Sequence, residues 1–158
     1  CMRELQHLEL NEVVAEVART KPFLGICMGM QVLMQHSDEN QGVDCLGIYQ
    51  GQVRHFGDGH TQVTPVERLK IPQMGWNQVW QTQPHALWSG IQDGARFYFV
   101  HSYYVQLDDV RLQTGATDYG IRYTSALALD NVFAIQCHPE KSARDGLKLL
   151  ENLVHWDI

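Results

Sequence analysis

A cysteine between two glycines, Gly25-Ile26-Cys27-Met28-Gly29, stands where a short apolar run ends and a helical pattern begins. The apolar run at 22–26 predicts a strand, and the apolar positions and good helix formers at 30–34 predict a helix. A chain that passes from strand to helix within so few residues must turn sharply, and glycines on both sides allow this because they carry no Cβ. The sequence therefore predicts a strand, a tight turn and a helix, with Cys27 on the turn.

This segment has the form of a nucleophile elbow in which sulfur replaces oxygen. Such a turn projects its central side chain at the carboxyl edge of a sheet. The helix that follows would direct unpaired N–H groups and its positive dipole end toward Cys27, which favours the thiolate and could stabilise an oxyanion. The competing interpretation is a small buried core residue, as isolated cysteines usually are. The elbow pattern favours the nucleophile.

A second chemical motif, His138-Pro139-Glu140, follows a nearly continuous apolar run at 132–137. Such a run is typical of a strand buried on both faces. Because His138 precedes a proline, its backbone is expected to be extended, and Glu140, two residues on, then shares its face. If this strand runs parallel to 22–26, His138 leaves the sheet at the same edge as Cys27. The pattern predicts a Cys-His-Glu triad in which Glu140 orients the imidazole. The alternative is a core histidine followed by a helix-capping acid.

Three further segments are weaker candidates. Gln31, one helical turn after Cys27, could place its amide on a substrate or could be an exposed helix former. His101-Ser102-Tyr103 follows an alternating aromatic strand and could line the site, although aromatic packing at a strand end is the commoner explanation. Met74-Gly75-Trp76-Asn77, after a proline, predicts a turn bearing a large aromatic, which suits either a satellite core or a partner surface.

The remaining pattern predicts a single α/β domain over residues 1–158. An amphipathic helix is expected between Asn11, a candidate N-cap, and Lys21. Short β pieces at 51–56, 78–80 and 96–105 predict a mixed or antiparallel middle section. The closing helix is expected to begin at a capping box of Ser142 and Asp145 and to bury a face made of Leu147, Leu150, Leu153 and Val154. We expect an open, mostly parallel mixed sheet flanked by helices.

Charge and cysteine usage exclude several classes of function. A formal charge of -6 has the wrong sign for non-specific binding to nucleic acid or to an anionic membrane surface. No apolar run approaches the roughly 18 residues needed to span a bilayer, and no secretory signal pattern is present. The four cysteines are scattered without a Cys-x-x-Cys pair, which predicts free thiols. We expect a cytosolic protein whose partners are small molecules or proteins.

The segments Phe23-Leu24-Gly25-Ile26-Cys27-Met28-Gly29-Met30-Gln31 and Gln136-Cys137-His138-Pro139-Glu140-Lys141-Ser142 together resemble the class I, triad-type glutamine amidotransferases. Within that family, Pro72-Gln73-Met74-Gly75-Trp76-Asn77 and Tyr98-Phe99-Val100-His101-Ser102-Tyr103 are similar to the glutaminase subunits of imidazole glycerol phosphate synthase, of histidine biosynthesis. The likeness runs from Cys1 to the last helix. One departure is Cys137, where family members usually carry an aromatic residue. The resemblance implies a flavodoxin-like, three-layer fold.

The same resemblance implies a reaction and a partner. Cys27 would attack the carboxamide of L-glutamine, His138 would transfer the proton, and Glu140 would orient His138, so that glutamate and ammonia result. The resemblance places five residues around bound glutamine: Met28, Gln31, His101, Ser102 and Tyr103. The backbone N–H of Met28 would be one oxyanion donor. The resemblance also implies a heterodimer with a (β/α)₈-barrel cyclase subunit, which would receive the ammonia. The residues that it places against this subunit are Met74, Trp76, Asn77, Tyr98 and Lys141. It implies no metal and no organic cofactor.

The resemblance also concerns the start of the chain. Family members carry an N-terminal strand-helix-strand unit and a Pro-Gly-rich loop that supplies a second oxyanion donor. The sequence from Cys1 onward contains neither, so we expect a domain that is N-terminally truncated relative to the family. Two alternatives to the glutaminase remain at this point: a truncated, non-catalytic module that only docks on a partner, and a cysteine hydrolase acting on a different amide.

Overall fold

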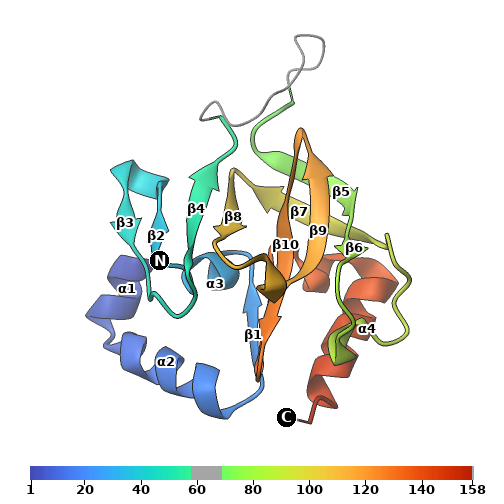
Figure 1. Ribbon diagram of the computed structural model, residues 1–158, viewed down its shortest axis with the longest axis horizontal. Helices are drawn as coiled ribbons and strands as arrows, with labels where there is room; N and C mark the ends of the chain where they lie inside the picture. The colour runs from blue at the N-terminus through green and yellow to red at the C-terminus, as the bar shows by residue number, and fades with distance from the viewer. Residues whose placement is uncertain (58–68, 158) are drawn as a thin grey trace.

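The computed structural model describes residues 1–57 and 69–157 (Figure 1). Its α-helices are α1 (Met2–His7), α2 (Leu10–Thr20), α3 (Met28–Gln31) and α4 (Ala143–Val154). Its 3₁₀ turns are η1 (Glu39–Gln41), η2 (Ala86–Trp88), η3 (Val110–Leu112) and η4 (Pro139–Lys141). Its strands are β1 (Phe23–Ile26), β2 (His36–Ser37), β3 (Val43–Asp44), β4 (Gly51–His55), β5 (Gln73–Gln78), β6 (Trp80–Gln81), β7 (Arg96–His101), β8 (Tyr103–Leu107), β9 (Gln113–Tyr119), β10 (Ile121–Leu129) and β11 (Val132–Ile135).

The described strands form a nine-stranded mixed sheet and a separate antiparallel pair, β5 and β7. The main path runs β1-β11-β10-β8-β4-β2-β3, with β9 beside β10 and β6 beside β9. The predicted mixed sheet with flanking helices is confirmed. Parallel pairing within the described residues is confined to β1–β11 and β2–β4, however, which is less than the mostly parallel sheet expected. Short turns join β9, β10 and β11, and strands joined by short turns must run antiparallel.

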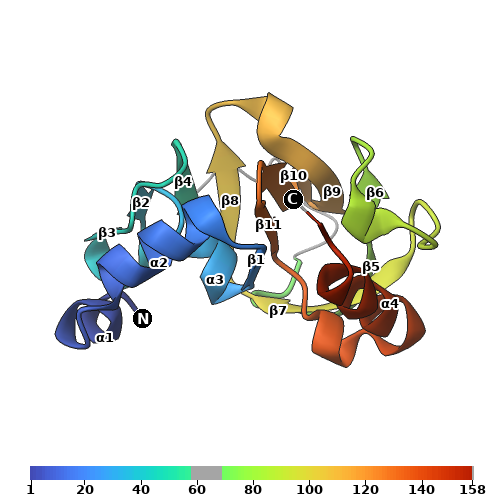
Figure 2. The same cartoon turned by 90° about the horizontal axis from the view of Figure 1, so that it is seen from below.

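The strand β11 is buried on both faces, as its apolar run predicts. Phe133 and Ile135 belong to one apolar cluster, which also contains Leu149 of α4. Val132 and Ala134 belong to a second cluster, which contains side chains of α2 and α3. Figure 2 shows α2 and α3 on one side of this strand and α4 on the other. Packing therefore immobilises β11 from both sides.

The first predicted helix is confirmed, but its N-cap is not Asn11. The helix α2 begins at Leu10, and Glu9 before it adopts a left-handed backbone with φ 55°. The reason is the preceding helix α1, which ends at His7 and leaves only a tight connection in which the chain must change direction. The sequence pattern showed the apolar stripe of α2 and did not show α1.

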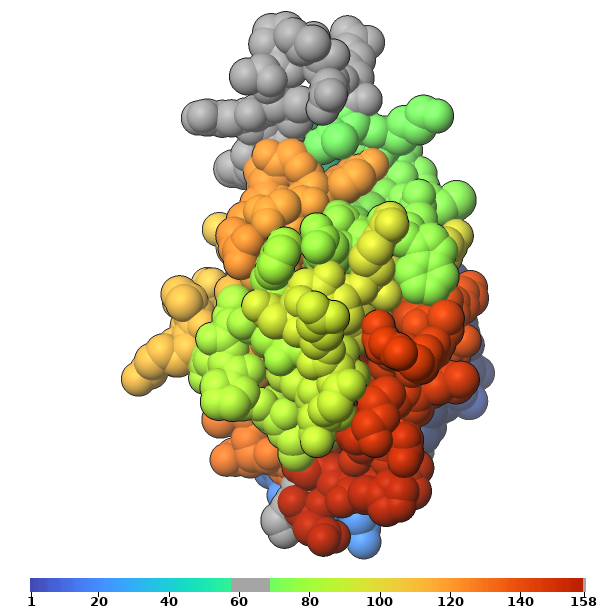
Figure 3. All heavy atoms as spheres, turned by 90° about the vertical axis from the view of Figure 1, so that its right-hand side faces the viewer, coloured from blue at the N-terminus to red at the C-terminus, as the bar shows by residue number. Residues whose placement is uncertain are grey.

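The closing helix α4 is confirmed, but its buried face differs from the one predicted. Leu149 is fully buried, whereas Leu147 is 63% exposed and Val154 is 81% exposed. Asn152 fixes the rotation of the helix, because its Nδ2 donates to Leu87 O at 2.9 Å. Figure 3 shows α4 lying along the segment around β6 and η2. Among the helices of the described residues, none is long and apolar enough to cross a membrane.

Candidate active site

Cys27 occupies a sharp turn between β1 and α3, as the elbow pattern predicts. Its backbone has φ 50° and ψ -103°, a conformation that side-chain-bearing residues rarely adopt. The Cys27 N–H donates to Ile135 O at 2.8 Å, and the Cys27 carbonyl accepts from Met30 N at 3.0 Å. Strain of this kind costs about 1–3 kcal/mol and persists only where the surroundings impose it. Here β11 holds one side of the turn and α3 the other.

The two glycines of the elbow are not equivalent. A Cβ at Gly25 would lie 2.8 Å from the carbonyl oxygen of Gly29 and 3.1 Å from Cβ of Ala134. A Cβ at Gly29 would meet no atom of the described residues within 4 Å. The prediction that steric crowding requires both glycines is therefore right for Gly25 and wrong for Gly29. The crowded place is the contact between β1 and the first turn of α3.

The parallel pairing of β1 with β11 brings the two chemical motifs together. Ile26 lies beside Ile135, so the residues that follow each strand emerge at the same edge of the sheet. His138 has an extended backbone with φ -102° and ψ 95°, and its N–H donates to Tyr98 O at 2.8 Å. The conditional expectation that both motifs leave one sheet edge is confirmed.

The imidazole of His138 has two different nitrogen environments. Its Nδ1 lies 2.7 Å from Glu140 Oε1, which is the contact predicted from the His-Pro-Glu spacing. Its Nε2 is buried and has no hydrogen-bond partner among the described residues. A carboxylate accepts the Nδ1–H of a neutral imidazole, which leaves the lone pair on Nε2. This ring can therefore accept a proton at Nε2.

Ser142 holds the His138 turn and does not cap α4. Its Oγ accepts the Tyr98 N–H at 2.9 Å and donates to His138 O at 2.6 Å. It makes no capping hydrogen bond to α4, so the predicted capping box with Asp145 is wrong. The hydroxyl is engaged by β7 and by the turn, which a local spacing rule could not anticipate.

The thiol of Cys27 is not poised as a thiolate. Burial is the largest influence and raises its pKa; the Met28 backbone N–H, the Gln136 amide and Lys141 lower it, and the Glu140 charge raises it. The expectation that the helix N-terminus favours the thiolate is met only in part: the Met28 N–H at the start of α3 lowers the pKa of Cys27, but burial outweighs it. The thiol needs a base to ionise near neutral pH.

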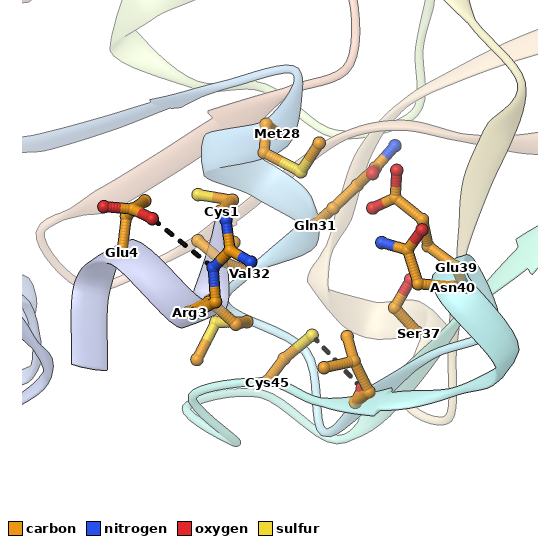
Figure 4. A pocket seen from close by; sticks show the side chains of 12 residues that line it. Cys1, Arg3, Glu4, Met28, Gln31, Val32, Ser37, Glu39, Asn40 and Cys45 are labelled. Atoms are coloured by element: carbon orange, nitrogen blue, oxygen red, sulfur yellow. Dashed lines mark hydrogen bonds and ion pairs between the residues drawn. The ribbon is translucent and has the colours of Figure 1, made fainter. Parts of the chain in front are cut away.

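A pocket of about 430 Å³ opens beside α3. Met28 and Gln31 of α3 line it, together with Glu39 and Asn40 of η1. Figure 4 shows the ends of the Gln31 and Glu39 side chains on the same side of this pocket. Sequence reasoning missed Glu39 and Asn40, because they belong to no motif and reach the pocket only through the chain reversal after α3.

Gln31 is 6% exposed, so the alternative of an exposed helix former is wrong. Its Nε2 donates to Tyr103 O at 3.1 Å and to Gln136 Oε1 at 3.1 Å. An amide nitrogen carries two hydrogens, and both are engaged here. Toward a ligand in the pocket, Gln31 can therefore offer only its oxygen.

The ring of His101 lies inside the core. Its Nδ1 is 2.7 Å from Tyr103 O, and its Nε2 is 3.0 Å from Gln73 Oε1 and 3.2 Å from Tyr123 Oη. Burial lowers the pKa of His101 to about 4, so the ring is neutral. Its contact with the pocket is indirect, through the Tyr103 carbonyl that also holds Gln31. Ser102 is half-buried, and its carbonyl accepts from Phe56 N at 3.1 Å.

The segment around Trp76 is a strand, β5, and not the turn predicted. Met74 is 64% exposed and Trp76 is 43% exposed, and both point away from the core because alternate strand residues face opposite sides. Trp76 packs edge-on against Tyr98 of β7 with ring centroids 6.0 Å apart. We refer to Met74, Trp76 and Tyr98 as the β5–β7 face.

Asn77 and Lys141 lie differently from these three. Asn77 is on the opposite side of β5, and its Nδ2 donates to Asp118 O at 2.9 Å. Lys141 is exposed at the end of η4, a turn that contacts β7. Among the described residues, no group of three or more His, Cys, Asp or Glu side chains is placed to hold a metal ion.

Comparison with known proteins agrees with this geometry. Residues 6–156 match the family model described as glutamine amidotransferase class-I. The chain is 56% identical over 156 residues to imidazole glycerol phosphate synthase subunit HisH of Dechloromonas aromatica, covering 99% of this chain and 72% of that protein. It is 51% identical over 157 residues to subunit HisH 1 of Pseudomonas aeruginosa, covering 99% and 73%.

A solved structure described as a glutamine amidotransferase from Thermotoga maritima superimposes with a TM-score of 0.58 at 16% identity. The match covers 98% of this chain, and the chain spans 56% of that one. At this identity the structural likeness concerns the fold alone.

Proposed function

Because the chain belongs to the class I glutamine amidotransferases, we propose that it acts as the glutaminase subunit of an imidazole glycerol phosphate synthase, the activity that the names of its HisH relatives imply. It hydrolyses L-glutamine to glutamate and ammonia, and the ammonia passes to a cyclase subunit in histidine biosynthesis. The observation that carries this proposal is the placement of Cys27 and the His138–Glu140 pair at one sheet edge. No observation on the described residues favours the docking-only alternative.

The proposed reaction uses the free Nε2 of His138. This nitrogen takes the thiol proton of Cys27, and Sγ attacks the side-chain carbonyl carbon of glutamine to form a tetrahedral intermediate. The intermediate collapses when His138 returns the proton to the departing nitrogen, which leaves as ammonia and leaves a thioester on Cys27. His138 then activates water, whose attack on the thioester releases glutamate and restores the thiol. Glu140 holds Nδ1–H throughout and stabilises the imidazolium.

The pocket beside α3 is the proposed glutamine site. Glutamine carries an α-ammonium group, and the Glu39 carboxylate in the pocket wall can pair with it. Gln31 can accept a hydrogen bond through its oxygen, since its nitrogen is engaged. The Met28 N–H, at the start of α3, is one proposed oxyanion donor. Ser102 and Tyr103 support the wall, and His101 acts through the Tyr103 carbonyl.

The proposed partner is a HisF-type (β/α)₈-barrel cyclase, bound as a heterodimer through the β5–β7 face, with Lys141 at its edge. Exposed Met and Trp side chains are typical of such interfaces. Asn77 would contribute by holding β5 to Asp118. We propose that residues 1–158 form one amidotransferase domain. The proposed compartment is the cytoplasm, because free thiols such as Cys27 and Cys45 suit a reducing environment.

The test is glutamate release from L-glutamine, measured in the presence and in the absence of a cyclase subunit with its nucleotide ligand. We expect turnover in the complex and its loss, by at least about 10³-fold, in Cys27→Ala, because the nucleophile is gone. The matched control is Ser89→Ala, which removes one side-chain oxygen from an exposed residue outside the pocket and should keep wild-type turnover. Glutaminase activity that survives in Cys27→Ala would overturn the proposed function.

A further inference from the structure

One buried polar side chain beside the nucleophile has no role in the reaction proposed for Cys27. Gln136 is fully buried, at the first position after β11. Its Nε2 lies 3.5 Å from Cys27 Sγ, within hydrogen-bonding range for sulfur, and its Oε1 accepts from Gln31 Nε2 at 3.1 Å. A buried amide would be costly here unless both of its ends were satisfied, and the two ends are satisfied by Gln31 and by the sulfur.

The direction in which the Gln136 amide points follows from its neighbours. The carbonyl oxygen of Tyr103 can only accept hydrogen bonds, so Gln31 must present its nitrogen there. The second hydrogen of that nitrogen points to Gln136, which must therefore present its oxygen to Gln31. The remaining end of the Gln136 amide, an N–H, faces the sulfur. The orientation of both amides is fixed by one backbone carbonyl.

The anchors of this arrangement are rigid. The backbone N–H of Gln136 donates to Ser125 O of β10 at 2.8 Å. The backbone N–H of Gln31 donates to Cys27 O at 3.2 Å, so Gln31 and the nucleophile share the first turn of α3. The Tyr103 carbonyl is itself held by His101 Nδ1 at 2.7 Å. An amide fixed in this way loses little entropy when it stabilises a charge on the sulfur.

Other groups also act on the sulfur, and the Met28 backbone N–H lowers the pKa of Cys27 more than the Gln136 amide does. From η4, the negative charge of Glu140 disfavours a thiolate and the positive charge of Lys141 favours one, so the two oppose each other. His138, which receives the proton, becomes positive only after transfer. Cys137 is neutral in the core. Within the described part of the chain, the hydrogen-bond donors toward Sγ are the Met28 backbone N–H and the Gln136 amide. The Met28 N–H is the one also proposed for the oxyanion.

We propose that Gln136 is a catalytic residue that donates its Nε2–H to Cys27 Sγ, stabilising the thiolate when it attacks and when it leaves the thioester, and that Gln31 is the positioning residue that directs this amide. The proposal rests on the proposed function, because it takes Cys27 as the nucleophile. The division of roles leaves the Met28 N–H for the oxyanion and assigns the sulfur to Gln136.

The experiment measures the ionisation of Cys27 without requiring turnover. The chain is alkylated with iodoacetamide between about pH 6 and 10, and modification of Cys27 is followed by peptide mass spectrometry, which separates it from the other three thiols. Gln136→Met keeps the volume of the side chain and removes the donor. We expect it to raise the apparent pKa of Cys27 by about one unit and to slow alkylation at pH 7 about tenfold. Gln31→Met should raise the pKa by a smaller amount.

Gln92→Met is the matched control, because Gln92 is exposed in a loop and should give the wild-type profile. A folded Gln136→Met chain that alkylates with the wild-type pH profile would overturn the inference. If Gln136→Met does not fold, a wild-type profile in Gln31→Met overturns it instead. Glutaminase turnover that persists in Cys27→Ala would sink the proposed function, and the alkylation profile distinguishes that outcome from failure of the Gln136 assignment.

Discussion

At the scale of single residues, we predict different effects of alanine at the two elbow glycines, Gly25 and Gly29. Gly25→Ala would press a methyl group against the Gly29 carbonyl, a backbone atom that cannot rotate away. We expect the free energy of unfolding to fall by about 1–3 kcal/mol, as overpacking of a core contact usually costs. Gly29→Ala, which meets open space within a helix, should leave stability within about 1 kcal/mol of wild type and could raise it. Urea denaturation of both variants measures the difference, and equal losses would contradict the steric account.

Residue-level patterns predicted the side chains of the proposed triad and missed two of the groups that lie around it. Cys27, His138 and Glu140 stand in short motifs whose geometry is local, and their placement at one sheet edge needed only parallel strands. Glu39 stands in no motif, and Gln136 belongs to a segment that carries the family resemblance, but no spacing rule places either side chain beside a thiol. They reach the site because η1 folds back on α3 and because Gln136 directly follows β11.

At the scale of elements, we predict the effect of widening the close contact between α4 and η4. A Cβ at Gly146 would overlap Pro139 O and lie 2.7 Å from Ser142 Cβ, so an alanine there must push α4 away from the turn that carries His138. We expect Gly146→Ala to lower the free energy of unfolding by at least about 2 kcal/mol and to reduce glutaminase kcat, because Ser142 and His138 move together.

The control on the same helix is Leu147→Ala, since Leu147 is 63% exposed and should change stability by less than about 0.5 kcal/mol. Chemical denaturation measures stability, and glutamate release in the complex measures kcat. Wild-type kcat in a folded Gly146→Ala chain would show that the turn does not depend on this close approach.

At the scale of the whole molecule, the β5–β7 face and the proposed site are joined by backbone contacts. Tyr98 packs against Trp76 on the outer side of β7, while its own N–H and carbonyl hold Ser142 and His138. A partner that covers this face therefore rests on the strand that positions the imidazole. Gln73, at the start of β5, connects through its side chain: its Oε1 lies 3.0 Å from His101 Nε2, and the other ring nitrogen of His101 contacts the Tyr103 carbonyl.

Trp76→Ala is the whole-molecule test of the partner face. We expect it to weaken cyclase binding by about 30-fold or more, because an aromatic at the centre of an interface commonly contributes at least about 2 kcal/mol. Val110→Ala removes an apolar side chain that is 71% exposed on η3, and it should bind the cyclase as wild type does. Titration calorimetry with the cyclase gives both dissociation constants. Equal constants for Trp76→Ala and wild type would place the interface elsewhere.

The sequence by itself determined the elements whose signals lie within a few consecutive residues. The strand β11 was readable from its apolar run, the elbow from its glycines and the extended His138 from the proline after it, because each depends on local sterics and burial. Only the tertiary structure decided what each polar group contacts. Ser142 looked like a helix cap and instead joins β7 to the His138 turn, and burial of Cys27 outweighs the helix end that should have ionised it. Hydrogen bonds and desolvation are set by atoms distant in the chain, so a linear pattern locates a functional group but does not reveal its environment.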